Sequence, residues 1–142
     1  MPVLRDAIGA PVDGVEFTES LETVLRDLRA QCAVRPHLRV DDTYGIMLHA
    51  PDGTGQGLTS PLGGTDAQRL ASLADQVQEW AVEALWSEGA PAVWPTCPAH
   101  PDAHPLTARV VVDTAVWVCP RSGATAARIG ELESRRRDRT PG

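Results

Sequence analysis

The sequence contains no lysine and no asparagine, and all 13 of its basic residues are arginine. This usage indicates a GC-rich coding sequence and not a physical adaptation. A phosphate-binding loop needs a Lys-Ser/Thr step after its glycines, because that lysine reaches the phosphates. Without such a step, we interpret the glycine-rich stretch Gly53–Gly64 as turns.

Long apolar runs are also missing, since none approaches the roughly 20 residues that a membrane-spanning helix needs. No charged segment followed by an apolar run opens the sequence, so no secretory signal is predicted. The 3 cysteines are too few for a disulfide framework. We expect a soluble cytoplasmic protein with no membrane partner, in a compartment where clusters of reduced cysteine and histidine tend to bind metal.

An excess of positive charge is absent as well. The formal net charge is −6, whereas nucleic-acid binders usually present a basic face. The composition therefore disfavours a nucleic-acid partner. The arginine-rich tail Glu133–Gly142 is an exception, and we predict that it is a disordered, solvated end.

Two segments carry apolar residues at helical spacing. The first, Glu16–Ala33, is predicted to have Thr18 as its N-cap and Asp27 on its polar side. The second, Thr65–Ser87, begins with a capping box. Its apolar stripe also fits heptad spacing, so a homodimer through this second helix stays open as an alternative.

Short runs bounded by turn residues predict antiparallel strands at 38–40, 44–50, 56–60, 107–112, 115–118 and within 124–132. The fold class is therefore α+β, with two main helices packed on short antiparallel strands and a C-terminal zinc-ribbon-like hairpin. We predict a single domain over residues 1–132, a zinc-ribbon-like subdomain at 94–123 within it, and the tail at 133–142.

The subdomain concentrates Cys97, His100, His104 and Cys119 in the spacing C-x2-H-x3-H-x14-C. Thiolates and imidazoles are zinc ligands, and four of them complete a tetrahedral Zn2+ site. Each cysteine precedes a proline, which fixes φ and favours a tight turn. The two turns resemble the knuckles of a zinc ribbon. Ser122 stands where the second knuckle of that family has Cys or His, so His104 is predicted to supply the fourth ligand.

A hairpin with a two-residue turn at Asp113-Thr114 would place Ala108 opposite Cys119. Directly opposed residues share one face of a hairpin, and alternation puts His104 on that same face. The register therefore lets His104 and Cys119 converge. A slip by one residue would turn Cys119 to the other face.

Three functions remain open from these residues. The first is a non-enzymatic binding or adaptor protein with a structural zinc and an unidentified protein partner. The second is a small zinc-dependent hydrolase, in which Cys97, His100 and Cys119 hold the metal and His104 or Asp102 handles protons. The third is a nucleic-acid-associated zinc-ribbon protein.

An enzyme is the less favoured alternative, because no nucleophile–base pair is evident outside the cluster. Cys32 continues the apolar stripe of the first helix and is predicted to be a buried free thiol. His37 and His49 are lone strand residues. Trp94 and Trp117 are expected to pack over the metal site or against the second helix.

The segment W-P-T-C-P-A-H-P-D-A-H-P-L, together with W-V-C-P-R-S-G, resembles a widespread group of small uncharacterised actinobacterial proteins. The tryptophan-bearing helix Gln76–Ser87 that precedes it adds to the resemblance, which covers roughly the C-terminal half of the chain. The group has no assigned activity, so the resemblance implies none here.

Overall fold

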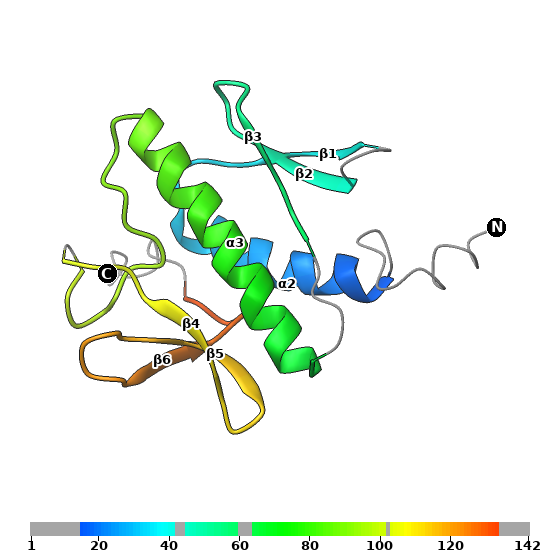
Figure 1. Ribbon diagram of the computed structural model, residues 1–142. Helices are drawn as coiled ribbons and strands as arrows, with labels where there is room; N and C mark the ends of the chain where they lie inside the picture. Colours follow the sequence, from blue (N-terminus) through cyan, green and yellow to red (C-terminus); the bar gives the residue numbers. More distant parts are fainter. Residues whose placement is uncertain (1–14, 42–44, 60–63, 102, 134–142) are drawn as a thin grey trace, which may run out of the picture.

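The computed structural model describes residues 15–41, 45–59, 64–101 and 103–133. Within them the chain forms two helices and two three-stranded antiparallel sheets, so the fold is α+β, as predicted (Figure 1). Neither helix has the length and apolar character needed to cross a membrane. In chain order the elements are α2 (Val15–Gln31), β1 (His37–Asp41), β2 (Gly45–His49), β3 (Gly55–Gly57), α3 (Asp66–Ser87), β4 (Thr107–Val111), β5 (Thr114–Val118) and β6 (Thr125–Arg128).

The helix α3 begins and ends where the sequence predicted. The Thr65 hydroxyl accepts the Gln68 N–H at 3.1 Å, and the Gln68 side chain accepts the Thr65 N–H at 2.9 Å, which completes the capping box. Gly89 lies just beyond the last turn at φ +75°, a conformation that glycine adopts easily. The apolar stripe of α3 is buried in the chain's own core and consists of Leu73, Ala74, Val77, Trp80, Ala81, Ala84 and Leu85.

The helix α2 starts earlier than predicted. It runs from Val15, so Thr18 lies within its first turn and the assignment of Thr18 as N-cap was wrong. The burial of Phe17 explains why the helix begins before Thr18. Its ring is buried on the same face as Leu21 and Val24, so the apolar stripe of the helix extends back past Thr18.

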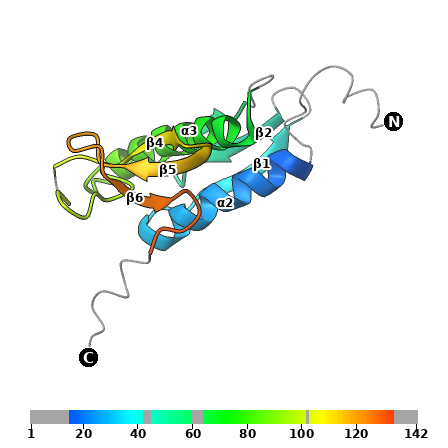
Figure 2. The same ribbon diagram turned by 90° about the horizontal axis from the view of Figure 1, so that it is seen from below.

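The two sheets lie on different sides of the helix pair. In Figure 1 the β1–β2–β3 sheet is above the helices and the β4–β5–β6 sheet is below them. Seen from below, the second sheet lies across both helices (Figure 2). α2 packs against α3, and α3 also contacts β4 and β5. The buried core accordingly draws residues from both helices and both sheets.

A glutamine side chain holds the first sheet on α3. The Thr59 N–H donates to Gln76 Oε1 at 2.8 Å, and Gln76 Nε2 donates to the Thr59 carbonyl at 2.9 Å. The amide of Gln76 thus pairs with Thr59 as a neighbouring strand would. Gln56 adds a hydrogen bond from its side chain to the Gln76 carbonyl at 3.1 Å.

A buried carboxylate, Asp27, joins α2 to the second sheet. It is 0% exposed and accepts hydrogen bonds from Trp117 Nε1 at 2.8 Å, the Gly130 N–H at 2.6 Å and the Leu132 N–H at 3.0 Å. Burial raises the pKa of Asp27 above its ordinary 3.8, and these hydrogen bonds oppose that effect. The sequence placed Asp27 on the polar side of the helix, which was wrong, because its three donors come from residues 90 or more positions away.

We expect Asp27→Asn to lower the free energy of unfolding by about 2–3 kcal/mol, because an amide has one acceptor oxygen and leaves buried donors unpaired. Urea unfolding followed by tryptophan fluorescence measures the change. The matched control is Asp75→Asn on the exposed face of α3, which should alter stability by less than about 0.5 kcal/mol. Equal losses in the two variants would contradict a special role for Asp27.

Candidate metal centre

The first three members of the cluster lie on one closed loop between α3 and β4. The loop is closed at its base, where Thr96 and Pro105 form an isolated bridge and the Leu106 N–H donates to the Pro95 carbonyl at 2.9 Å. Inside it, the His100 N–H donates to the Cys97 carbonyl at 3.1 Å, which forms the predicted tight turn. The loop therefore brings Cys97, His100 and His104 to the same end of the second sheet.

The second turn follows β5 and carries Cys119. The Gly123 N–H donates to the Cys119 carbonyl at 2.8 Å, and the Cys119 N–H donates to the Ala124 carbonyl at 2.8 Å. Gly123 has a φ of +79°, which a residue with a Cβ rarely adopts. The turn also brings Ser122 beside the Cys119 sulfur.

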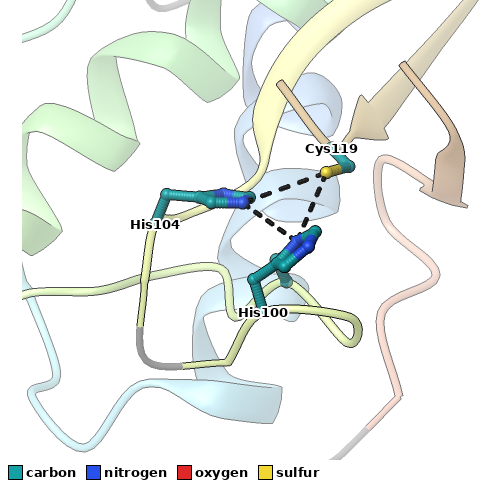
Figure 3. Close-up of side chains that lie close together, drawn as sticks. His100, His104 and Cys119 are labelled. Carbon is teal, nitrogen blue, oxygen red and sulfur yellow. Dashed lines mark hydrogen bonds between the residues drawn. The ribbon is translucent and has the colours of Figure 1, made fainter. Parts of the chain in front are cut away.

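The structure brings all four predicted side chains together. One ligand atom from each of Cys97, His100, His104 and Cys119 lies within 4.8 Å of all the others. His100 Nδ1 is 3.6 Å from Cys97 Sγ, 3.7 Å from Cys119 Sγ and 3.1 Å from His104 Nε2. His104 Nε2 is 3.9 Å from Cys119 Sγ. Figure 3 shows His100, His104 and Cys119 converging on one point.

These separations match the edges of a tetrahedral metal site. With bonds of about 2.3 Å to sulfur and about 2.05 Å to nitrogen, a zinc tetrahedron has N–N edges of roughly 3.3 Å, N–S edges of roughly 3.6 Å and S–S edges of roughly 3.8 Å. The N–N distance here is 3.1 Å and three of the four N–S distances are 3.6–3.9 Å, while all four atoms lie within 4.8 Å of one another. The cluster could therefore hold a metal ion of this size without large rearrangement.

The hydrogen bonding of His104 selects the nitrogen that faces the cluster. Its Nδ1 lies 3.1 Å from the Pro105 carbonyl. A carbonyl oxygen can only accept, so Nδ1 carries the proton and donates it. In the neutral ring this leaves the lone pair on Nε2, the atom that points at His100 and Cys119. Such a carbonyl partner commonly fixes the tautomer of a metal-bound histidine.

Hydrogen bonds among the four side chains explain their arrangement less well than a bound cation does. His100 Nδ1 has three neighbours within 3.7 Å but carries at most one proton. It can therefore donate to one neighbour only. A divalent ion at the centre satisfies both sulfurs and both nitrogens at once. The donor set thus fits a metal better than a metal-free network.

The β4–β5 hairpin has a different register from the predicted one. The turn falls at Val112 and Asp113, both at positive φ, so Ala108 pairs with Trp117 and not with Cys119. The prediction was wrong by two residues, a step that preserves the alternation of faces. Cys119 therefore still points to the expected side. All of β5 from Ala115 onward is buried, and the turn places β-branched Val112 in an uncommon conformation.

Helix side chains fix the backbone around the cluster. Gln78 Nε2 donates to the Trp94 carbonyl at 3.1 Å and to the Leu106 carbonyl at 2.6 Å. Gln31 Oε1 accepts the N–H of Thr96, the residue before Cys97, at 3.1 Å. Sequence reasoning missed both glutamines, since local spacing gives no sign of partners 28 and 65 positions away.

The two tryptophans are buried and pack against each other, and their predicted position over the metal site or against the second helix stays a prediction. Trp94 and Trp117 are 1% and 0% exposed, and their rings meet edge to face with centroids 5.4 Å apart. Both belong to the core cluster that includes Cys97 and Cys119. They therefore form part of the apolar surroundings of the candidate site.

The Cys119 thiol ionises more readily than an ordinary cysteine. Its pKa is lowered to about 6, chiefly by the hydrogen bond from the Ser122 hydroxyl and next by the Ser122 N–H, while burial acts in the opposite direction. Metals bind the thiolate and not the thiol. Ser122, which the sequence marks only as a missing ligand, therefore supports the Cys119 ligand instead.

Among the described residues, no other cysteine, histidine or carboxylate joins the cluster. Cys32 is buried, as predicted, and burial raises the pKa of its thiol. His37 is exposed, and the His49 ring packs over Gly55, where an added Cβ would lie 2.8 Å from it. Asp113 comes just before the first residue of β5, whereas Cys119 comes just after the last one, so the two lie at different ends of the strand. Asp102 falls outside the described residues.

The chain matches no protein-family model, no curated protein and no solved structure. The resemblance to small actinobacterial proteins therefore stays a prediction.

We expect Ser122→Ala to move metal release on acidification to higher pH by roughly half a pH unit. Without the hydroxyl the pKa of the Cys119 thiol rises, so protons displace the metal earlier as the pH falls. Release into a chromophoric chelator during acid titration measures the midpoint. Ser20→Ala on α2 removes a hydroxyl outside the cluster and serves as the control. A release midpoint that is unchanged, or lower, in Ser122→Ala would refute the role of this hydrogen bond.

Proposed function

We propose that Cys97, His100, His104 and Cys119 bind one zinc ion, and that the protein is a non-enzymatic binding or adaptor protein built around this structural site. The observation that carries the proposal is the convergence of four donor atoms within 4.8 Å of one another, with four of their six separations near those of a zinc tetrahedron. Two sulfurs and two nitrogens in this geometry are typical of zinc, because softer thiolate ligands and tetrahedral geometry disfavour magnesium and calcium.

A structural role is supported by the number of ligands. A catalytic zinc keeps a coordination position open for water or substrate, whereas a structural zinc has four protein ligands. His104 Nε2 lies inside the cluster as the fourth donor, so it is not free to move protons for the alternative of a hydrolase. Within the described residues, Asp113 is too far along the hairpin to act as a base.

The arrangement explains what the metal would do for the fold. It would join the loop after α3 to the turn after β5. Gln31 and Gln78 already hold the first of these segments on the helices. A zinc-ribbon-like C-terminal unit would then be fixed on the helix pair at both ends.

The remaining alternatives have less support. A nucleic-acid-associated role would rest on the arginine tail, of which only Glu133 is described, and on a chain with a net charge of −6. A homodimer through α3 was left open as an alternative because of an apolar stripe, most of which is buried in the chain's own core. Such a dimer would have to use Trp86, which is 74% exposed at the end of the helix.

Elemental analysis of the purified protein tests the metal centre. We expect one zinc per chain in the wild type, and a reduced content in Cys97→Ser and His104→Ala. Loss of the ion should lower the melting temperature by about 10 °C or more, since zinc binding contributes to folding.

The matched controls replace the same residue types outside the cluster. Cys32→Ser and His37→Ala should keep a full complement of zinc. A full complement in His104→Ala would show that this histidine is not a ligand. A wild type that is well folded without metal would remove the site.

A further inference from the structure

The strand β1 leaves apolar side chains uncovered at the edge of the first sheet. The strand order β1–β2–β3 puts β1 at one edge. Leu38 and Val40 pair with Leu48 and Ile46 of β2 and share their face of the sheet. Leu48 and Ile46 are buried, but Leu38 is 42% and Val40 is 73% exposed. The apolar face of the sheet therefore continues past the helices that cover it.

The same two residues direct their main-chain groups away from the sheet. In β2, the Ile46 carbonyl accepts from Leu58 at 3.0 Å, and the Ala50 N–H donates to Thr54 at 2.8 Å, so even-numbered residues bond toward β3. Main-chain groups alternate along a strand, so Met47 and His49 bond toward β1, where they pair with Arg39 and His37. The N–H and C=O groups of Leu38 and Val40 consequently face outward.

Arg39 lies between these two residues, on the opposite face of β1. It is exposed, and its cross-strand neighbour is the uncharged Met47. A strand paired with β1 would place one side chain directly opposite Arg39, where an opposite charge is favourable and a like charge is unfavourable. The side chains along this edge therefore alternate from apolar Leu38 to cationic Arg39 to apolar Val40.

We propose that β1 binds an extended segment of a partner protein as an added antiparallel strand, with two apolar residues opposite Leu38 and Val40 and a carboxylate opposite Arg39. Addition of a strand to a sheet edge is a common mode of peptide recognition, in which main-chain bonds give affinity and alternate side chains give specificity. This assignment names the partner class for the proposed binding role. It does not depend on the metal, which belongs to the other sheet.

A second copy of the chain fits this edge less well in the register that opposes both apolar residues, since the register with Val40 opposite Val40, which sets Arg39 against Asp41, keeps only one apolar pair. Aligning two β1 strands so that Leu38 lies opposite Val40 also places Arg39 opposite Arg39. Like charges directly opposed across a strand pair are destabilising. A central charge on an edge strand is in fact a common device against self-pairing. An acidic partner strand removes this conflict.

The test uses the full-length protein and two capped peptides, each with a central Val-Glu-Val or Val-Lys-Val flanked by threonines. Titration of isotope-labelled protein, followed by amide chemical shifts, should show binding of the glutamate peptide with the largest changes at Leu38 and Val40. We expect the glutamate peptide to bind at least about fivefold more tightly than the lysine peptide.

Two variants separate charge recognition from strand pairing. Arg39→Glu should reverse the preference between the two peptides, whereas Arg109→Glu, in the middle of edge strand β4, should leave it unchanged. Val40→Pro removes the outward N–H of residue 40. An edge strand tolerates proline at such a position, because that N–H makes no bond within the sheet. The substitution should abolish binding of both peptides while circular dichroism shows an intact fold.

Several results would overturn the proposal. These are no binding of either peptide, equal binding of both with no effect of Arg39→Glu, and unchanged binding to Val40→Pro. Sedimentation showing a dimer that Val40→Pro dissociates would assign the edge to a second copy instead. Zinc content is measured on the same samples, so a failure of peptide binding in metal-loaded protein counts against this edge and not against the metal centre.

Discussion

The attachment of the second sheet to the helices depends on a buried carboxylate, the side chain of Asp27. Asp27 accepts three hydrogen bonds from groups on and after β5. A buried carboxylate is costly unless it is fully hydrogen-bonded, so α2 and the C-terminal segment can pack in only one way. Trp117 fills the core on the same side, and the chain after β6 turns back along α2 to supply the two backbone donors. The sheet is thereby fixed in position as well as in register.

The candidate metal centre lies at the same end of β5 as the Asp27 hydrogen bond. Trp117 and Cys119 are two residues apart, near the end of β5 and just beyond it, so the Asp27 hydrogen bond and the cluster constrain neighbouring positions of the chain. Gln78 and Gln31 hold the facing loop by its main chain. Cys97, His100 and His104 are therefore presented by a loop whose backbone is held by both helices, and Cys119 by a turn closed by its own main-chain hydrogen bonds. Such pre-positioning reduces the ordering that metal binding would otherwise require.

The sequence predicted the parts of this structure that depend on neighbouring residues. The capping box of α3, the strands and the grouping of Cys97 with His100 all follow from spacings of a few residues. His104 and Cys119 could be joined to them because alternation along a strand survives an error of two residues in register. Predictions from local patterns were wrong where residues outside the pattern determine the environment of a side chain. Asp27 looks like a surface residue until Trp117 and Gly130 are placed beside it. Thr18 looks like a cap until Phe17 is known to be buried.

The two sheets are held in different ways, and this difference determines which edge is free. The second sheet has a central strand, β5, that is buried from Ala115 onward and is fixed by Asp27 and the cluster. The first sheet is covered only over β2, through Ile46 and Leu48, and its return segment is clamped by Gln76. β1 therefore contributes hydrogen bonds to the sheet but little to the core. Because none of the described residues is seen to use its outward groups, a bound strand would extend the sheet without competing with the contacts that support the candidate metal centre.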